Sequence, residues 1–374
     1  MIRPELVVFS HLRWNFVWQR PQHLIARIGA GRRTWFVEEP QVVAGVTAPR
    51  LQVVRDGGVR RVWLEVGGEP RHVGFDDPAA ADYGSALAEL LGSHPGRTVW
   101  AYTPMALPLI DRLERSLLVY DVMDDLASFA FAPPAMRLNQ QRLLRAADIV
   151  FTGGRSIHAG VERRTPAPVH LFPSGVEPEH FAAARELRAS RERPVAGYVG
   201  VIDERIDLDL VGGLAERLPA WDVEIVGPVV KIDPGTLPAA PNLRYPGMQP
   251  YHRLPEVMGG FDVALMPFAL NEATRSISPT KTLEYLAAGL PVVSTRVPDV
   301  VADHAGVVAL RDDAAGFAAA CHDALTRPDA ARDRRVRAVL RMHHWDAIAR
   351  RMRTLMDEVA TSPERAARSA GAVT

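Results

Sequence analysis

Short apolar runs alternate with amphipathic segments along almost the whole chain, and this alternation constrains the fold more than any other feature. Apolar, strand-like runs occupy residues 5–9, 34–38, 98–102, 116–121, 148–152 and 169–172 in the first half, and 194–202, 221–227, 243–247, 261–268, 291–295 and 307–310 in the second. Segments with helical spacing, such as 20–30 and 137–147, separate them. Because parallel strands need a crossover connection, the pattern is typical of βαβ units. We predict an α/β fold with two doubly wound, Rossmann-like sheets.

Interruptions of this rhythm predict the domain boundaries. Residues 41–75 combine Gly, Pro and alternating Val, which favours hairpin-like insertion strands. The turn-rich, charged stretch 174–192 separates the two series of strands and is the predicted linker. A length of 374 residues suits two domains. We expect an N-terminal domain at 1–178, a C-terminal domain at 179–335, a C-terminal helix at 336–360 and a disordered tail at 361–374.

Composition argues against several classes of protein. The 44 Lys and Arg residues balance 44 Asp and Glu residues, whereas a nucleic-acid partner usually requires a strongly basic surface. No uninterrupted apolar stretch reaches about 18 residues, so we expect no membrane span. Cys321 is the only cysteine. It supports neither an intramolecular disulfide nor a Cys-rich zinc site, and we expect a cytoplasmic protein with no metal and no cofactor.

Ligands of open α/β sheets bind beyond the carboxyl ends of the strands, so a site is expected in the loops after strands. None of these loops carries a G-x-G-x-x-G or GxxxxGK[ST] phosphate-binding motif, and the chain has no HExxH or GxSxG sequence. The sequence therefore argues against dinucleotide-dependent dehydrogenases, P-loop NTPases, zincins and nucleophile-elbow hydrolases.

The strongest local signal is the segment SISPTKTLEYLAAGLPVVST at 276–295. Ser278 is a good helix N-cap and Pro279 a good first helical residue. Thr280 and Lys281 then fall in the first turn, where free backbone N–H groups and the helix dipole favour a phosphate. We interpret the segment as a helix start that faces a ligand crevice.

Lysine is scarce in this chain, since only Lys231 and Lys281 are lysines among the 44 basic residues. Glu284 lies three residues after Lys281 on the same helix face, where its carboxylate could accept two hydrogen bonds from a ribose diol. A surface ion pair between the two explains the spacing equally well. Lys231 could reach a donor phosphate or carboxylate, or it is an exposed loop lysine.

The stretch LEYLAAGLPVVST at 283–295 resembles the donor-site helix of GT-B glycosyltransferases. Similar stretches follow the order of that family: FPSGVEPEHF at 172–181, GYVGVIDERIDLDLV at 197–211 and HHWDAIARRM at 343–352. The stretches FSHLRWNFVWQRPQHL and LVYDVMDDLASF resemble bacterial surface-polysaccharide transferases of the teichuronic-acid type. The resemblance implies the GT-B architecture, with two domains facing across a cleft, a nucleotide-sugar donor on the C-terminal domain and the acceptor on the N-terminal domain.

The resemblance also implies roles for single residues. Glu284 would hold the ribose and Arg205 would contact the diphosphate. Independently of the resemblance, Gly200 and Gly227 fit a close approach of the backbone to a ligand or serve as plain turns. The last helix, around Trp345, would cross back to the N-terminal domain. Many retaining members carry a second glutamate eight residues before the ribose-binding one; Ser276 stands there in this chain. We therefore do not assign retention or inversion.

The loop after the first strand supplies candidates for the acceptor side. Indole rings offer flat surfaces for a sugar ring, and polar side chains at the helix start could reach a phosphate or hydroxyl. These acceptor-side candidates are Trp14, Trp18, Arg20 and Gln22. Burial between the domains explains the two tryptophans as well, and His23, inside the helix, is expected to be structural.

Catalytic candidates are His11 in the same loop and the carboxylates that follow the strand ending near Asp121. Asp124 or Asp125 could act as general base or bind acceptor hydroxyls. A helix-capping role for one of these aspartates is equally compatible with the sequence.

We predict a glycosyltransferase that moves a sugar from a nucleotide diphosphate sugar to a hydroxyl of a cell-surface glycan or a lipid-linked acceptor. A lipid-linked acceptor would need peripheral contact with the inner face of the membrane. The alternatives are a nucleotide-sugar epimerase or hydrolase on the same fold, and a non-catalytic scaffold that binds a nucleotide sugar or glycan.

Overall fold

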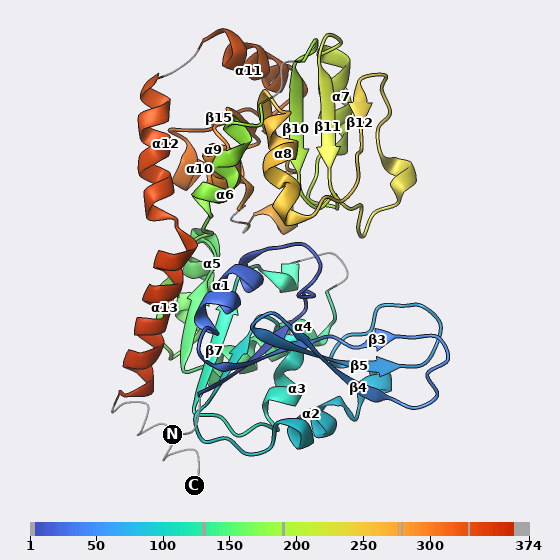
Figure 1. Cartoon of the computed structure of the whole chain (residues 1–374), viewed down its shortest axis with the longest axis vertical. Coiled ribbons are helices and arrows are strands. Elements are labelled where there is room, and N and C mark those ends of the chain that lie inside the picture. Colours follow the sequence, from blue (N-terminus) through green and yellow to red (C-terminus); the bar gives the residue numbers. More distant parts are fainter. Residues whose placement is uncertain are drawn as a thin grey trace.

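The computed structural model describes residues 4–128, 132–188, 191–275, 277, 280–327 and 330–362. These residues form two α/β domains, one above the other in Figure 1. The predicted fold class is confirmed, because each domain is built on a mainly parallel sheet with crossover helices.

The first sheet has the order β3-β5-β2-β1-β6-β7-β8-β9, and its pairs are parallel except for β4, which pairs antiparallel with β5 as the predicted hairpin. Its strands are β1 (Glu5–Ser10), β2 (Arg33–Glu38), β3 (Gln41–Val42), β4 (Arg50–Asp56), β5 (Val59–Val66), β6 (Arg97–Ala101), β7 (Leu117–Val122), β8 (Ile149–Thr152) and β9 (Val169–Leu171). Its helices are α1 (Arg20–Ile28), α2 (Tyr83–Leu91), α3 (Leu107–Ile110), α4 (Ala135–Ala146) and α5 (Arg155–Val161).

The second sheet is parallel throughout, in the order β12-β11-β10-β13-β14-β15. Its strands are β10 (Val195–Val199), β11 (Asp222–Val226), β12 (Leu243–Arg244), β13 (Val263–Met266), β14 (Val292–Ser294) and β15 (Ala309–Leu310). The helices that follow the first sheet are α6 (Pro178–Ala182), α7 (Leu208–Arg217), α8 (Leu254–Gly259), α9 (Lys281–Ala287), α10 (Pro298–His304), α11 (Ala314–Thr326), α12 (Ala330–Met342) and α13 (Trp345–Ala360).

Apolar strands explain why the sheets are covered on both faces. All residues of β1 are buried, as expected for a parallel strand between two layers of helices. One apolar cluster lies on each face of the first sheet, and a third fills the second domain. No helix in the described part of the chain is long and apolar enough to cross a membrane.

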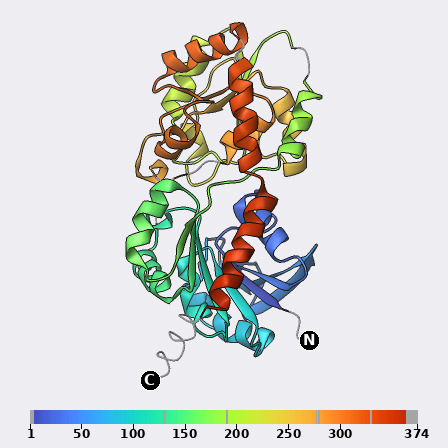
Figure 2. The same ribbon diagram turned by 90° about the vertical axis from the view of Figure 1, so that its left-hand side faces the viewer.

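The C-terminal helices divide between the two domains (Figures 1 and 2). Val336 and Leu340 of α12 belong to the core of the second domain, so the crossing predicted over 336–360 begins later, after α12. Helix α13 packs with α1 on the first sheet, and its Trp345 and Met352 are buried there. Residues 363–374, most of the predicted tail, lie outside the described part of the chain.

The chain passes between the domains twice, and the two passages touch. The Val176 N–H donates to the His343 carbonyl oxygen at 2.8 Å, and the Trp345 N–H donates to the Val176 oxygen at 3.2 Å. Val176 and Phe181 already belong to the second core, so that core begins slightly before the predicted boundary at 178/179. Strands of both sheets end at one pocket between the domains, which residues from each domain line.

Candidate functional site

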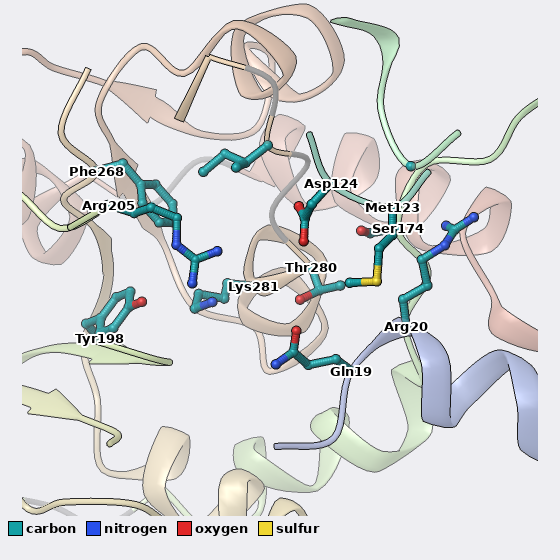
Figure 3. Close-up of a pocket in the computed structure, with 12 residues that line it drawn as sticks. Gln19, Arg20, Met123, Asp124, Ser174, Tyr198, Arg205, Phe268, Thr280 and Lys281 are labelled. Carbon is teal, nitrogen blue, oxygen red and sulfur yellow. The ribbon is translucent and has the colours of Figure 1, made fainter. Parts of the chain in front are cut away.

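A pocket lies between the domains, at the carboxyl ends of strands from both sheets (Figure 3). This is where open α/β sheets bind ligands. The lining residues of the first domain are Gln19, Arg20, Met123, Asp124, Gly153 and Ser174, and those of the second are Tyr198, Arg205, Phe268, Ile277, Thr280 and Lys281. The pocket therefore combines predicted donor-side residues with Asp124, one of the predicted carboxylates.

Lys281, the first residue of α9, lies against two glycine turns. Its Nζ lies 5.7 Å from the centroid of the Tyr198 ring. A Cβ atom on Gly200 would overlap Lys281 Cε, and a Cβ atom on Gly227 would overlap the Gly200 carbonyl oxygen. Both glycines have positive φ angles, +157° and +151°. Gly200 thus leaves the space through which Lys281 reaches the pocket, and Gly227 allows its own turn to pack on the Gly200 backbone.

We expect Gly200→Ala to weaken binding of a nucleoside diphosphate about 10-fold, because the methyl group must displace the Lys281 ammonium from its ligand. Calorimetric titration measures the effect. Gly57→Ala is the matched control, because Gly57 also has a positive φ, +55°, but has open space around it. Equal affinities in the two variants would show that the Gly200 turn does not position Lys281.

Arg205 lies in the pocket in a fixed orientation. Its Nε donates to both Asp203 oxygens at 2.9 and 3.1 Å, and one terminal nitrogen donates to Oδ2 at 2.7 Å. Burial lowers the pKa of Arg205, but the hydrogen bonds with Asp203 and the charges of Asp203 and Asp124 together raise the pKa overall. Asp203 is 4% exposed. The sequence did not predict it as a site residue, although it stands two residues before Arg205.

Glu284 is half-buried one turn after Lys281 on α9. Burial raises the pKa of Glu284 to about 7, and the Lys281 charge opposes this shift. Burial, followed by the Arg205 charge, lowers the pKa of Lys281. In the part of the chain that the structure describes, no ion pair joins Lys281 to Glu284, so the ion-pair explanation of their spacing is not supported.

The raised pKa of Glu284 predicts a pH-dependent cost to folding. The carboxyl binds its proton more tightly in the folded state (pKa about 7) than at its ordinary value of 4.5, so its contribution to stability falls as pH rises from about 4.5 through 7. We expect Glu284→Gln, which cannot ionise, to gain melting temperature relative to the native protein between pH 5 and pH 8. A difference in melting temperature that stays constant over this range would contradict the raised pKa.

The aspartates in and after β7, which are Asp121, Asp124 and Asp125, have different environments. Asp124 is half-buried in the pocket; burial raises its pKa, and the charges of Arg205, Arg20 and Lys281 oppose that shift. Asp125 accepts a hydrogen bond from the Ser128 hydroxyl at 2.7 Å and does not line the pocket. Asp124 is therefore the one of these carboxylates that faces the donor-side cations.

Arg20 forms a buried ion pair that the sequence did not predict. Its Nε and one terminal nitrogen donate to Asp121 at 3.0 to 3.2 Å, and the other terminal nitrogen donates to the Phe172 oxygen at 2.8 Å. Although Arg20 lines the pocket, its guanidinium joins α1 to β7 and to the interdomain connection. Arg20 thus lines the pocket, where it was expected, and its acceptor-side role stays a prediction.

The structure contradicts the acceptor-side roles predicted for Gln22 and Trp14. Gln22 is fully buried and its amide donates to the Arg13, Trp14 and Val17 oxygens, so it shapes the loop rather than binding a ligand. Trp14 is 6% exposed and packs edge-on against Phe36, so it offers no free face to a sugar.

Trp18 lies at the contact between the domains. Its ring lies 5.9 Å from that of Tyr251, and its Nε1 donates to His23 Nδ1 at 3.2 Å. His23 is buried and stacks on Trp345 at 5.0 Å, in agreement with its expected structural role. Neither Trp18 nor His23 lines the pocket.

His11 and Lys231 do not line the pocket either. Burial, followed by the charge of Lys231, lowers the pKa of His11 to about 4. Lys231 is exposed and has a positive φ of 64°.

Thr280 is the N-cap position of α9, whereas the predicted cap Ser278 lies outside the described residues, as does Ser276.

Comparisons with known proteins identify relatives of this chain. Residues 193–327 match the family described as glycosyl transferases group 1. TuaH of Bacillus subtilis (strain 168), a protein named for glycosyl transfer in teichuronic acid biosynthesis, is 28% identical over 179 residues. That match covers 45% of this chain and 45% of TuaH, so the chain spans about half the length of this curated relative.

Solved structures with the same fold cover nearly the whole chain. Sucrose-phosphate synthase from Thermosynechococcus elongatus has a TM-score of 0.69 at 16% identity over 96% of this chain and 99% of its own. An α,α-trehalose-phosphate synthase (UDP-forming) from Burkholderia vietnamiensis has a TM-score of 0.68 at 15% identity over 97% and 99%. At this identity the likeness shows the fold, which is the predicted GT-B architecture.

Proposed function

We propose that this chain moves a sugar from a nucleotide diphosphate sugar to an acceptor hydroxyl, because residues 193–327 match the family described as glycosyl transferases group 1. One observation carries the proposal: Lys281 and Arg205 of the second domain face Asp124 of the first across one pocket (Figure 3). A cationic side can hold a leaving diphosphate, and the opposite carboxylate can hold an acceptor hydroxyl.

On the donor side, Lys281 and Arg205 bind the diphosphate and Glu284 binds the ribose. The Asp203 carboxylate fixes the guanidinium of Arg205 before any ligand arrives, so little reorganisation is needed when negative charge develops on the leaving group. In this proposal protein cations supply that charge stabilisation, with no metal or other cofactor.

On the acceptor side, Asp124 accepts a hydrogen bond from the attacking hydroxyl. The Asp124 carboxyl is half-buried next to three cations. An ionisable group therefore lies close to the reacting atoms. The acceptor is a cell-surface glycan or a lipid-linked precursor of one, and the partial similarity to TuaH supports this class.

A thermal-shift screen over nucleoside diphosphates tests the donor side. A ligand at 100 times its dissociation constant raises the free energy of unfolding by about 2.7 kcal/mol. We expect at least one nucleoside diphosphate to stabilise the native protein and to lose this effect in Arg205→Ala. The absence of stabilisation by every nucleoside diphosphate would contradict the proposal.

We further propose peripheral contact with anionic lipid at the cytoplasmic face of the membrane. An arginine-rich groove on the first domain supports it, lined by Gln141, Arg145, Arg163, Arg164, Thr165 and Pro166. Helix α4, which forms one side, has no acidic residue and exposes Leu138 at 60%. Arginine and apolar side chains together suit an anionic lipid surface.

Vesicle co-sedimentation tests this contact. At about 1 kcal/mol per charge, Arg145→Glu and Arg163→Glu should each weaken binding to phosphatidylglycerol vesicles several-fold or more. Arg337→Glu, an exposed arginine of α12, is the control and should bind as the native protein does. Equal binding of all three variants, or native binding no stronger than to neutral phosphatidylcholine vesicles, would contradict the contact.

A further inference from the structure

A buried carboxylate of the second domain accepts hydrogen bonds from the first domain. Asp299, in α10, is 3% exposed. It accepts hydrogen bonds from the Arg155 N–H at 2.9 Å, the Ser156 N–H at 3.2 Å and the Ser156 hydroxyl at 2.7 Å. All three donors belong to the start of α5. Because an unpaired buried carboxylate is costly, this contact favours one relative position of the two domains.

Helix α5 depends on the same contact. Its N-cap is Gly154, which has no side chain to accept hydrogen bonds from the first turn. Asp299 takes over that capping role from the other domain. If the domains moved apart, both the helix start and the carboxylate would lose their partners, so the energy of the contact is tied to domain position.

The capped segment leads directly into the pocket. Gly153, two residues before Arg155, lines the pocket, and a Cβ atom on it would lie 2.6 Å from the Met123 carbonyl oxygen. Gly153 thus packs on the backbone that presents Asp124. On the other side, α10 follows α9 and β14 in sequence, so one continuous stretch of the second domain carries both Lys281 and Asp299.

We propose that Asp299 is an interdomain positioning residue for sugar transfer. By holding the segment from Gly153 to Ser156, its carboxylate keeps Asp124 facing the cations of the second domain. The effect on catalysis rests on the function proposed above, whereas the effect on domain position does not. The hydrogen-bond donors to Asp299 do not line the pocket. Asp299 therefore acts on the pocket indirectly, through Ser156 and Gly153.

A neighbouring ion pair provides a matched control. Asp303, one turn after Asp299 on α10, pairs with the side chain of Arg155 at 2.5 Å. That arginine side chain is 57% exposed, and exposed pairs contribute little. Asp303→Asn therefore removes a charge at the same junction without touching the buried contact.

The test measures interdomain distance and turnover in the full chain. Paired spin labels at the exposed positions Glu89 and Glu216, changed to cysteine, report the distance between the domains; the native Cys321 is buried and should not react. We expect Ser156→Ala and Asp299→Asn, checked as folded by circular dichroism, to broaden the distance distribution toward longer values. Asp303→Asn and Ser156→Thr, which keeps the hydroxyl, should retain the native distribution.

In transfer assays we expect kcat to fall about 10-fold in Ser156→Ala and more in Asp299→Asn, while affinity for nucleoside diphosphate stays within about 3-fold of the native value. Unchanged distances in both variants, or an equal change in Asp303→Asn, would overturn the proposal. The variants could alter the interdomain distances while the native protein transfers no sugar. That result would support the positioning role and contradict the proposed function.

Discussion

Replacing Asp124 by asparagine is expected to lower turnover by about 10²- to 10⁴-fold, the range for loss of a general base. Asp124 is the carboxylate that lines the interdomain pocket on the first-domain side, and asparagine keeps its size but cannot accept a proton. Steady-state kinetics with donor and acceptor measure the loss, and calorimetry should find nucleoside diphosphate binding close to that of the native protein.

Asp125→Asn is the control, because Asp125 bonds Ser128 and does not line the pocket. It should keep turnover within a few-fold of the native rate. If both variants turn over at the native rate, Asp124 is neither a base nor an acceptor ligand. If Asp125→Asn shows the larger loss, the assignment between the two aspartates is reversed.

Lys281→Ala is expected to weaken binding of a nucleoside diphosphate by roughly 10- to 150-fold, the equivalent of one charged hydrogen bond of about 1.5 to 3 kcal/mol. Binding of the nucleoside alone should change little, because Lys281 would contact only the diphosphate. Glu284→Ala should weaken both ligands, since it would remove the contact with the ribose. Calorimetric titrations of the two ligands distinguish these effects.

Lys281→Arg tests why an arginine-rich chain has lysine at this position. The planar guanidinium is larger than the ammonium, and the Gly200 turn leaves little space beside the side chain. We expect Arg at this position to recover only part of the lost affinity. Full recovery would mean that charge alone decides binding, and equal affinities in all three variants would move the donor site away from α9.

Local patterns were enough to predict the fold and to find Lys281, which lines the pocket. Alternating apolar and amphipathic segments predict both sheets, since burial on two faces leaves a direct mark on strand composition. Lys281 was identified from a helix start and Arg205 from the resemblance to the GT-B family, and both line the pocket. Such features depend on residues close in sequence.

The acceptor side was predicted less well, because its interactions join distant residues. The pair of Arg20 and Asp121 spans 101 positions, and neither segment alone indicates it. Burial of Trp14 results from packing on a neighbouring strand. Asp299 had no sequence signal, because its partners lie 143 and 144 positions away, in the other domain.

The most direct test of the central claim is product analysis with a nucleotide sugar that binds the native protein. The protein is incubated with this donor, with and without a glycan or lipid-linked acceptor, and nucleoside diphosphate and sugar products are quantified by mass spectrometry. We predict that nucleoside diphosphate and glycosylated acceptor form in equal amounts, only when both substrates are present, and that Asp124→Asn nearly abolishes both. Equal nucleoside diphosphate release without acceptor, an epimerised donor, or no turnover of any bound donor would contradict a glycosyltransferase.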